Sequence, residues 1–207
     1  MLRTALLCAA LAIGGYASAA WLTHDFQAWT AEGARRLEVA LAPVAAPPVL
    51  VEGPATPAQV LPEVVADGRS VTIVDFVYTR CQTVCLSLGN TFQQLQAALQ
   101  ADPAANVRLL SVSFDPRDSS PDLQAYAARM RADAKHWRFV RGADPRQTQA
   151  LLSAFQVVVV PDGRGDFEHN AALLVVDQRG RLVRIFDIAE QELALNYARH
   201  LAAKGTS

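Results

Sequence analysis

Residues 71–92 read VTIVDFVYTRCQTVCLSLGNTF, and this stretch decides the fold. The apolar run from Val71 to Val77 predicts a buried strand, and the spacing of apolar residues from Leu86 to Gln100 predicts an amphipathic helix. Cys81 and Cys85 therefore lie at a strand-to-helix turn, where residues four apart share one helix face. Because a helix N-terminus favours negative charge, both thiolates are stabilised there. The arrangement suits a soft metal ion or a reversible disulfide.

The rest of the chain after Ser70 alternates between strand and helix patterns. The further expected strands cover 107–114, 137–140, 156–160, 171–177 and 181–187, and the further expected helices cover 121–134, 145–155 and 190–203. Ser120 is the expected N-cap of the second helix, and Gln178-Arg179-Gly180 is typical of a hairpin turn. This order predicts an α/β fold with a central mixed sheet and helices on both faces. A strand, a two-cysteine turn and a helix are also how the thioredoxin-like fold begins.

The composition limits both size and function. The chain has 207 residues, 51% of them hydrophobic, which is enough for one globular domain with an N-terminal appendage. Nineteen basic and twenty acidic residues give a net charge of -1, which gives no support to nucleic-acid binding. Of three cysteines, Cys8 lies in the N-terminal apolar segment, so the globular part holds only the spaced pair. Such sparing use indicates a site rather than a disulfide scaffold.

The N-terminal segment, residues 1–22, is predicted to be a membrane anchor or a signal peptide. Residues from Thr4 to Leu22 carry no charge, and Arg3 precedes them, so the short tail is expected in the cytoplasm and the remaining chain outside it. Ala17-Ser18-Ala19 matches a signal-peptidase site, while Trp21 suits an interfacial anchor, and we favour the anchor. A lipoprotein attachment at Cys8 is disfavoured, because Leu7 stands where a small residue is required.

Residues 23–69 are predicted to be a tether. Asp25 to Leu41 has the apolar spacing of a surface helix, which Gly33 would interrupt. Six prolines then fall between Pro43 and Pro62, a density typical of an extended spacer. The globular domain is accordingly expected over residues 70–207.

A metal held by two thiolates needs a further donor. Four histidines exist: His24 abuts the membrane segment and is distant from the domain in sequence, and structural or exposed roles are expected for His136 and His200. His169 lies in a loop before a buried strand, although position alone favours an ordinary loop histidine. Two thiolates and one imidazole would suit copper, as Cu(I) or Cu(II). A closed zinc site requires four ligands, and an iron–sulfur cluster requires more cysteines.

Four blocks of sequence resemble the Sco/SenC family of copper-binding, thioredoxin-like proteins that assist cytochrome c oxidase assembly. These blocks are residues 75–85, 111–118, 137–142 and 169–177, and the resemblance covers about residues 70–190 in the same order. It implies that Cys81, Cys85 and His169 bind one copper ion. Two positions depart from the family pattern: Thr83 stands where an acidic residue is common, and Leu86 where a proline is common. Asp115 and Asp118, within the second block, are interpreted as turn residues rather than ligands.

The resemblance predicts an exported, membrane-anchored copper chaperone. Its partner would be an apo cytochrome oxidase subunit with a CuA-type site, or another copper protein. The expected location is the bacterial inner membrane with a periplasmic domain, or the soluble periplasm if the leader is cleaved. A second function remains open, a thiol-disulfide oxidoreductase in which Cys81 attacks a client disulfide and Cys85 resolves the intermediate, with a thiol reductant restoring the pair. A peroxiredoxin is disfavoured, because its Pro-x-x-x-Thr-x-x-Cys setting is not met: Thr79 lies two residues before Cys81, and no such proline stands upstream.

Overall fold

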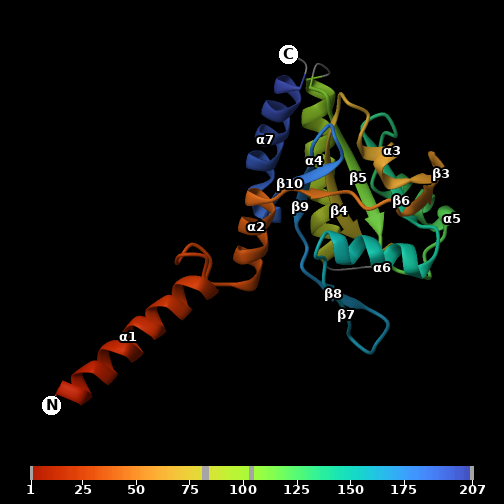
Figure 1. Ribbon diagram of the computed structural model, residues 1–207. Helices are drawn as coiled ribbons and strands as arrows, with labels where there is room; N and C mark the ends of the chain where they lie inside the picture. Colours follow the sequence, from red (N-terminus) through yellow and green to blue (C-terminus); the bar gives the residue numbers. More distant parts are fainter. Residues whose placement is uncertain (1, 81–83, 103–104, 206–207) are drawn as a thin grey trace.

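The computed structural model describes residues 2–80, 84–102 and 105–205, with the side chains of 84–87 outside the described set. A large mixed sheet has the strand order β1-β10-β9-β4-β5-β6-β2-β3, and β7 and β8 form a separate hairpin (Figure 1). The strands are β1 (Val44–Ala45), β2 (Leu50–Gly53), β3 (Thr56–Val60), β4 (Val71–Val77), β5 (Val107–Ser113), β6 (Trp137–Gly142), β7 (Val159–Pro161), β8 (Phe167–His169), β9 (Leu173–Val176) and β10 (Arg181–Phe186). The helices are α1 (Leu2–Leu22), α2 (Ala31–Leu41), α3 (Leu61–Val65), α4 (Val84–Ala101), α5 (Ser120–Arg129), α6 (Pro145–Ala154) and α7 (Gln191–Lys204), with a 3-10 turn η1 (Ile188–Glu190).

The predicted mixed sheet with helices on both faces is confirmed. β4, β5 and β6 run parallel, while β9, β10 and the strands before β4 pair antiparallel to their neighbours. Successive residues of β4 face opposite sides of the sheet, as the strand period of two requires. Val74 and Phe76 pack in the core under α3 and α6, whereas Val71 and Ile73 pack under α4, α5 and α7. All seven residues of β4 are buried, which explains why five of the seven are apolar.

Some predicted boundaries were wrong. The apolar run 156–160 does not enter the main sheet, because only Val159–Pro161 is a strand and it pairs with β8. The helix expected over 121–134 ends at Arg129, and its N-cap is Ser119, not Ser120. The Ser119 side chain accepts from the backbone of Asp122, whose carboxylate accepts in return from the Ser119 backbone, so a capping box fixes the helix start one residue early.

The prediction of an extended tether over residues 23–69 is wrong for most of its length. β2 and β3 continue the sheet beyond β6, and β1 pairs with β10 at the opposite edge. Leu61 and Val65 of α3 are almost fully buried, and α2, which contains Gly33 without interruption, buries Val39. Pro57 is compatible with this structure because it lies in the edge strand β3, where a residue facing away from the neighbouring strand needs no backbone N–H.

Helix α1 projects away from the rest of the molecule (Figure 1). Its 21 residues have a mean hydropathy of 1.7 in the best window and no burial, so it is long and apolar enough to cross a membrane. A signal sequence would satisfy the same criteria. Thr23 closes the helix, since its hydroxyl donates to the Ala19 carbonyl oxygen at 2.6 Å and accepts from the Phe26 backbone.

Candidate metal centre

The loop that leads toward Cys81 is fixed by the end of the neighbouring strand. Asp118 follows β5 and is buried, and its carboxylate accepts hydrogen bonds from the Thr79 backbone N–H at 2.8 Å and the Thr79 hydroxyl at 2.7 Å. The same carboxylate accepts from Ser113 Oγ at 2.6 Å. Arg129 of α5 donates to the Thr79 carbonyl oxygen at 2.9 Å. The backbone two residues before Cys81 is therefore held from both sides.

Asp115 is a second buried carboxylate at this end of the sheet. It accepts from Arg80 at 2.6 Å and from two nitrogens of Arg117 at 2.9 Å. Burial alone would raise the pKa of Asp115, but the hydrogen bonds from Arg117 and Arg80 outweigh it and hold the pKa below its usual value. Asp115 and Asp118 thus do more than the predicted turn role. The sequence signal that could have indicated this role is topological. Residues that follow adjacent parallel strands, such as β4 and β5, lie at the same end of the sheet.

The β7–β8 hairpin is fastened to the same edge (Figure 1). The Tyr78 hydroxyl donates to Asp166 Oδ1 at 2.6 Å, and Arg117 Nη2 donates to the Gly165 carbonyl oxygen at 2.9 Å. Phe167 packs edge-on against Tyr78 with 5.2 Å between ring centroids, and the Arg117 guanidinium lies 5.5 Å from the Phe167 centroid. These contacts join the hairpin to the loops after β4 and β5.

Asn170 links the two chain segments at the open end of the β7–β8 hairpin. Its side-chain oxygen accepts from the Val158 backbone at 2.8 Å, and its amide nitrogen donates to the Gln156 carbonyl oxygen at 3.2 Å. The same amide nitrogen lies 3.5 Å from Glu32 Oε2 on α2, and Glu32 is paired with the buried Arg35. The helix that follows α1 therefore contacts the side chain of Asn170, the residue after His169.

His169 ends β8 and points its ring into an aromatic setting. The ring lies 5.1 Å from that of Phe114, which follows β5 and donates its backbone N–H to Val77 at the end of β4. His169 is thus at the carboxyl end of the parallel strands, where α4 also begins. Both ring nitrogens are buried and lack a hydrogen-bond partner within the described residues. Burial lowers the pKa of His169 to about 4, so the imidazole is neutral at physiological pH.

A neutral, unpartnered imidazole is chemically ready to act as a metal ligand. Buried polar atoms are normally satisfied, and a bound metal ion would satisfy one of the two nitrogens. Among the described residues no three His, Cys, Asp or Glu side chains converge as a metal site. Cys81 lies outside the described residues, and Cys85 lies in the first turn of α4 with its side chain outside the described set. Their meeting with His169 stays a prediction.

The other histidines occupy other parts of the molecule. His24 lies 3.4 Å from Glu38 of α2, near the end of α1. His136 precedes β6, at the amino end of the parallel strands and thus opposite His169. His200 is exposed on α7.

Comparison with known proteins identifies the family. The model of the SCO1/SenC family matches residues 61–202, well over half of the chain. The chain belongs to the SCO1/SenC family. It is 28% identical over 136 residues to the SCO1 protein homolog of Bacillus subtilis (strain 168), covering 60% of this chain and 70% of that protein.

Solved Sco structures share the fold. The structure of Bradyrhizobium japonicum ScoI with copper bound has a TM-score of 0.63 and 23% identity, covering 76% of this chain and 99% of that one. The structure of BsSco, reported with a disulfide switch and as a member of the Sco family of cytochrome c oxidase assembly proteins, has a TM-score of 0.67 and 21% identity, covering 78% and 95%. The predicted thioredoxin-like architecture is thereby confirmed.

Proposed function

We propose that this Sco protein binds one copper ion through Cys81, Cys85 and His169 and delivers it to the CuA-type site of an apo respiratory oxidase subunit. The observation that carries the proposal is the buried His169 imidazole, whose two nitrogens lack partners among the described residues. Membership of the SCO1/SenC family and the existence of a copper-bound ScoI structure support the same cargo.

The donor set accounts for binding in both oxidation states. Thiolates favour Cu(I), and an added imidazole favours Cu(II). His169 requires no deprotonation at neutral pH, because burial lowers its pKa to about 4. Tyr78 and Arg117 hold the hairpin that carries His169, so the imidazole is positioned before copper arrives. Three donors leave room for an incoming thiolate of the client, which allows transfer by ligand exchange.

We further propose that α1 anchors the chain in the inner membrane with the sheet domain in the periplasm. Its length and apolar composition support a span, and Arg3 at its start supports a cytoplasmic N-terminus. Cleavage after α1 would instead leave a soluble periplasmic protein. Immunoblotting of membrane and soluble periplasmic fractions distinguishes these outcomes by both mass and location.

Thiol-disulfide exchange is the second candidate function, favoured by the disulfide switch reported for BsSco. The Cys81 thiolate would attack one sulfur of a client disulfide and release the other as a thiolate. The Cys85 thiolate would then attack the Cys81 sulfur of the mixed disulfide and release the second client thiol. The client gains two electrons, Cys81 and Cys85 form a disulfide, and an external dithiol reductant restores them.

Copper titration of the full chain in non-ionic detergent tests the leading proposal. The reduced protein is titrated anaerobically with Cu(I) and Cu(II), and wild type is compared with His169→Ala. His200→Ala, which removes an exposed imidazole on α7, is the matched control. We expect one equivalent of copper, with Cu(II) affinity reduced at least tenfold in His169→Ala and unchanged in His200→Ala. Equal Cu(II) binding by both variants, together with efficient reduction of a disulfide substrate, would establish the oxidoreductase instead.

A further inference from the structure

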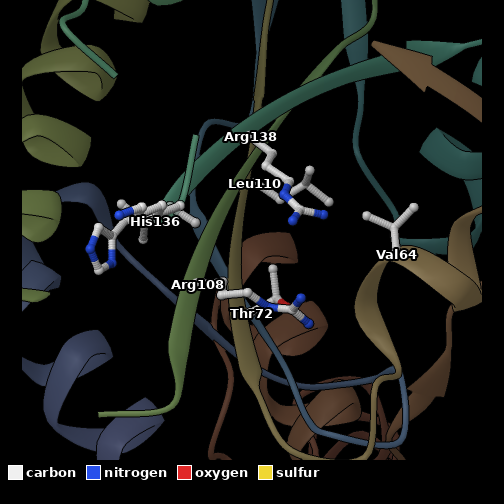
Figure 2. Close-up of a pocket in the computed structure, with 8 residues that line it drawn as sticks. Val64, Thr72, Arg108, Leu110, His136 and Arg138 are labelled. Carbon is white, nitrogen blue, oxygen red and sulfur yellow. The ribbon is translucent and has the colours of Figure 1, made fainter. Parts of the chain in front are cut away.

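A small cationic cavity lies at the amino end of the parallel strands, opposite His169. Thr72, Arg108 and Arg138 are the second residues of β4, β5 and β6, and pairing between these strands places them on one face of the sheet. Val64 of α3 covers that face, and Lys135 and His136 line the rim. Figure 2 shows both guanidinium groups on the side facing Val64, while the His136 ring points away from them.

The cavity carries more positive than negative charge. Arg108 pairs with Asp67 at 3.0 Å, and Asp67 also accepts from the backbone of Arg69 and from Ser70. Arg138 has no carboxylate partner among the described residues, and it repels Arg108. Of the two neighbouring guanidinium groups, only that of Arg108 is paired with a carboxylate among the described residues, and that carboxylate also accepts three hydrogen bonds from Arg69 and Ser70. A bound anion would relieve this repulsion.

A buried hydroxyl points to a ligand independently of the charge. Thr72 is 3% exposed, and its Oγ1 has no hydrogen-bond partner within the described residues. Leaving such a buried donor unsatisfied is costly in free energy, so a partner is expected. The hydroxyl lies beside the Arg108 side chain in Figure 2, on the wall of the same cavity.

The cavity volume limits the ligand to one small species. In this structure it is about 10 Å³, roughly the space of one water-sized particle and less than a chloride ion occupies. We propose that the cavity binds one monatomic anion of chloride size, held by the N–H groups of Arg108 and Arg138 and by the Thr72 hydroxyl. Both arginine side chains are partly exposed and can move slightly apart to admit an ion larger than water.

Chloride binding is tested with the full chain in non-ionic detergent by the line width of the ³⁵Cl NMR signal. Sodium gluconate keeps the ionic strength constant and supplies an anion too large to enter. We expect wild type to broaden the chloride signal, and Arg138→Gln to reduce the excess broadening at least threefold. Arg184→Gln, which removes an exposed arginine on β10, is the control and should match wild type. No excess broadening in wild type, or equal broadening by both variants, would mean that the cavity holds water only.

Thr72→Val provides a second test that does not depend on removing a charge. Valine has nearly the same shape but no hydroxyl, so this variant should unfold at the same or a higher temperature in gluconate. We expect chloride to raise the unfolding temperature of wild type at constant ionic strength, and this increase to be lost in Thr72→Val. An undiminished increase in the variant would overturn the assignment of the hydroxyl as a ligand. Copper titration should be unchanged in Thr72→Val and Arg138→Gln, since both residues lie at the opposite end of the strands.

Discussion

Asp75 is a carboxylic acid in the centre of β4 with no exposed surface. Neither of its oxygens has a partner in hydrogen-bond geometry within the described residues. Burial raises the pKa of Asp75 from 3.8 to about 7, and Ser111, opposite it on β5, only partly opposes this shift. The native protein therefore retains a proton on Asp75 at pH values where the unfolded chain has lost it.

Replacing Asp75 with asparagine should change how stability depends on pH. Between about pH 4 and pH 7 the folded state of wild type binds one more proton at Asp75 than the unfolded state, so stability falls as the pH rises through this window. The full difference corresponds to roughly 4 kcal/mol and is complete above pH 7. Thermal unfolding of Asp75→Asn at pH 5 and pH 8 should show a smaller decrease than wild type. Glu192→Gln, which removes an exposed carboxylate, is the control, and a variant that keeps the wild-type decrease would contradict the prediction.

His169 should show the opposite pH dependence. Its folded pKa of about 4 lies below the ordinary value of 6.5, so the unfolded chain binds more protons between these values and stability falls as the pH drops through them. In a ¹⁵N NMR titration of the copper-free protein, the His169 ring signals should keep the neutral form down to about pH 4. Absence of those signals in His169→Ala assigns them. Protonation close to pH 6.5 would show that the ring is solvated and not prepared for metal binding.

At the scale of elements, the β7–β8 hairpin holds His169 through a few specific contacts. Tyr78→Phe removes the hydroxyl that donates to Asp166 at 2.6 Å and leaves the packed ring in place. We expect a loss of about 0.5–1.5 kcal/mol in stability, as for a typical hydrogen bond. Amides of residues 158–170 should exchange several-fold faster by mass spectrometry, and Cu(II) affinity should fall. Tyr197→Phe on α7 is the control. Unchanged exchange in Tyr78→Phe would mean that ring packing and the Arg117 contact hold the hairpin without the Tyr78 hydroxyl.

The elements also show what the sequence allowed us to predict. Strands and helices inside the sheet domain have clear periodicity, and β4 was predicted with its observed bounds because five of its seven residues are apolar. The hairpin was not predicted, since Val159 and His169 pair across a short loop whose register depends on Tyr78 and Arg117 from elsewhere in the chain. Asp118 was missed for the same reason: its partner Thr79 lies 39 residues away.

At the scale of the whole molecule, the division between tether and domain that we expected from proline density was misleading. Proline density is a local signal, whereas β2 is fixed by pairing with β6, about ninety residues later, and β1 by pairing with β10. The resemblance to the Sco/SenC family began at about residue 70, so it did not indicate that residues before 70 belong to the sheet. By contrast, α1 was predicted well, because a long uncharged segment needs no tertiary partner to be recognised.

A chain that begins at Ser70 should therefore fail to fold. It would lack β1, β2, β3 and α3, and it would expose both edges of the remaining sheet. Burial of Val51, Leu61 and Val65 alone contributes about 1.5–3 kcal/mol each, a sum comparable to the 5–15 kcal/mol that stabilises a typical domain. A chain that begins at Trp29 keeps α2 and all strands, and it should give a cooperative thermal transition by circular dichroism. The Ser70 chain should give a broad transition or aggregate. A cooperative transition for the Ser70 chain would show that the first strands are dispensable and that the domain boundary expected from proline density was right after all.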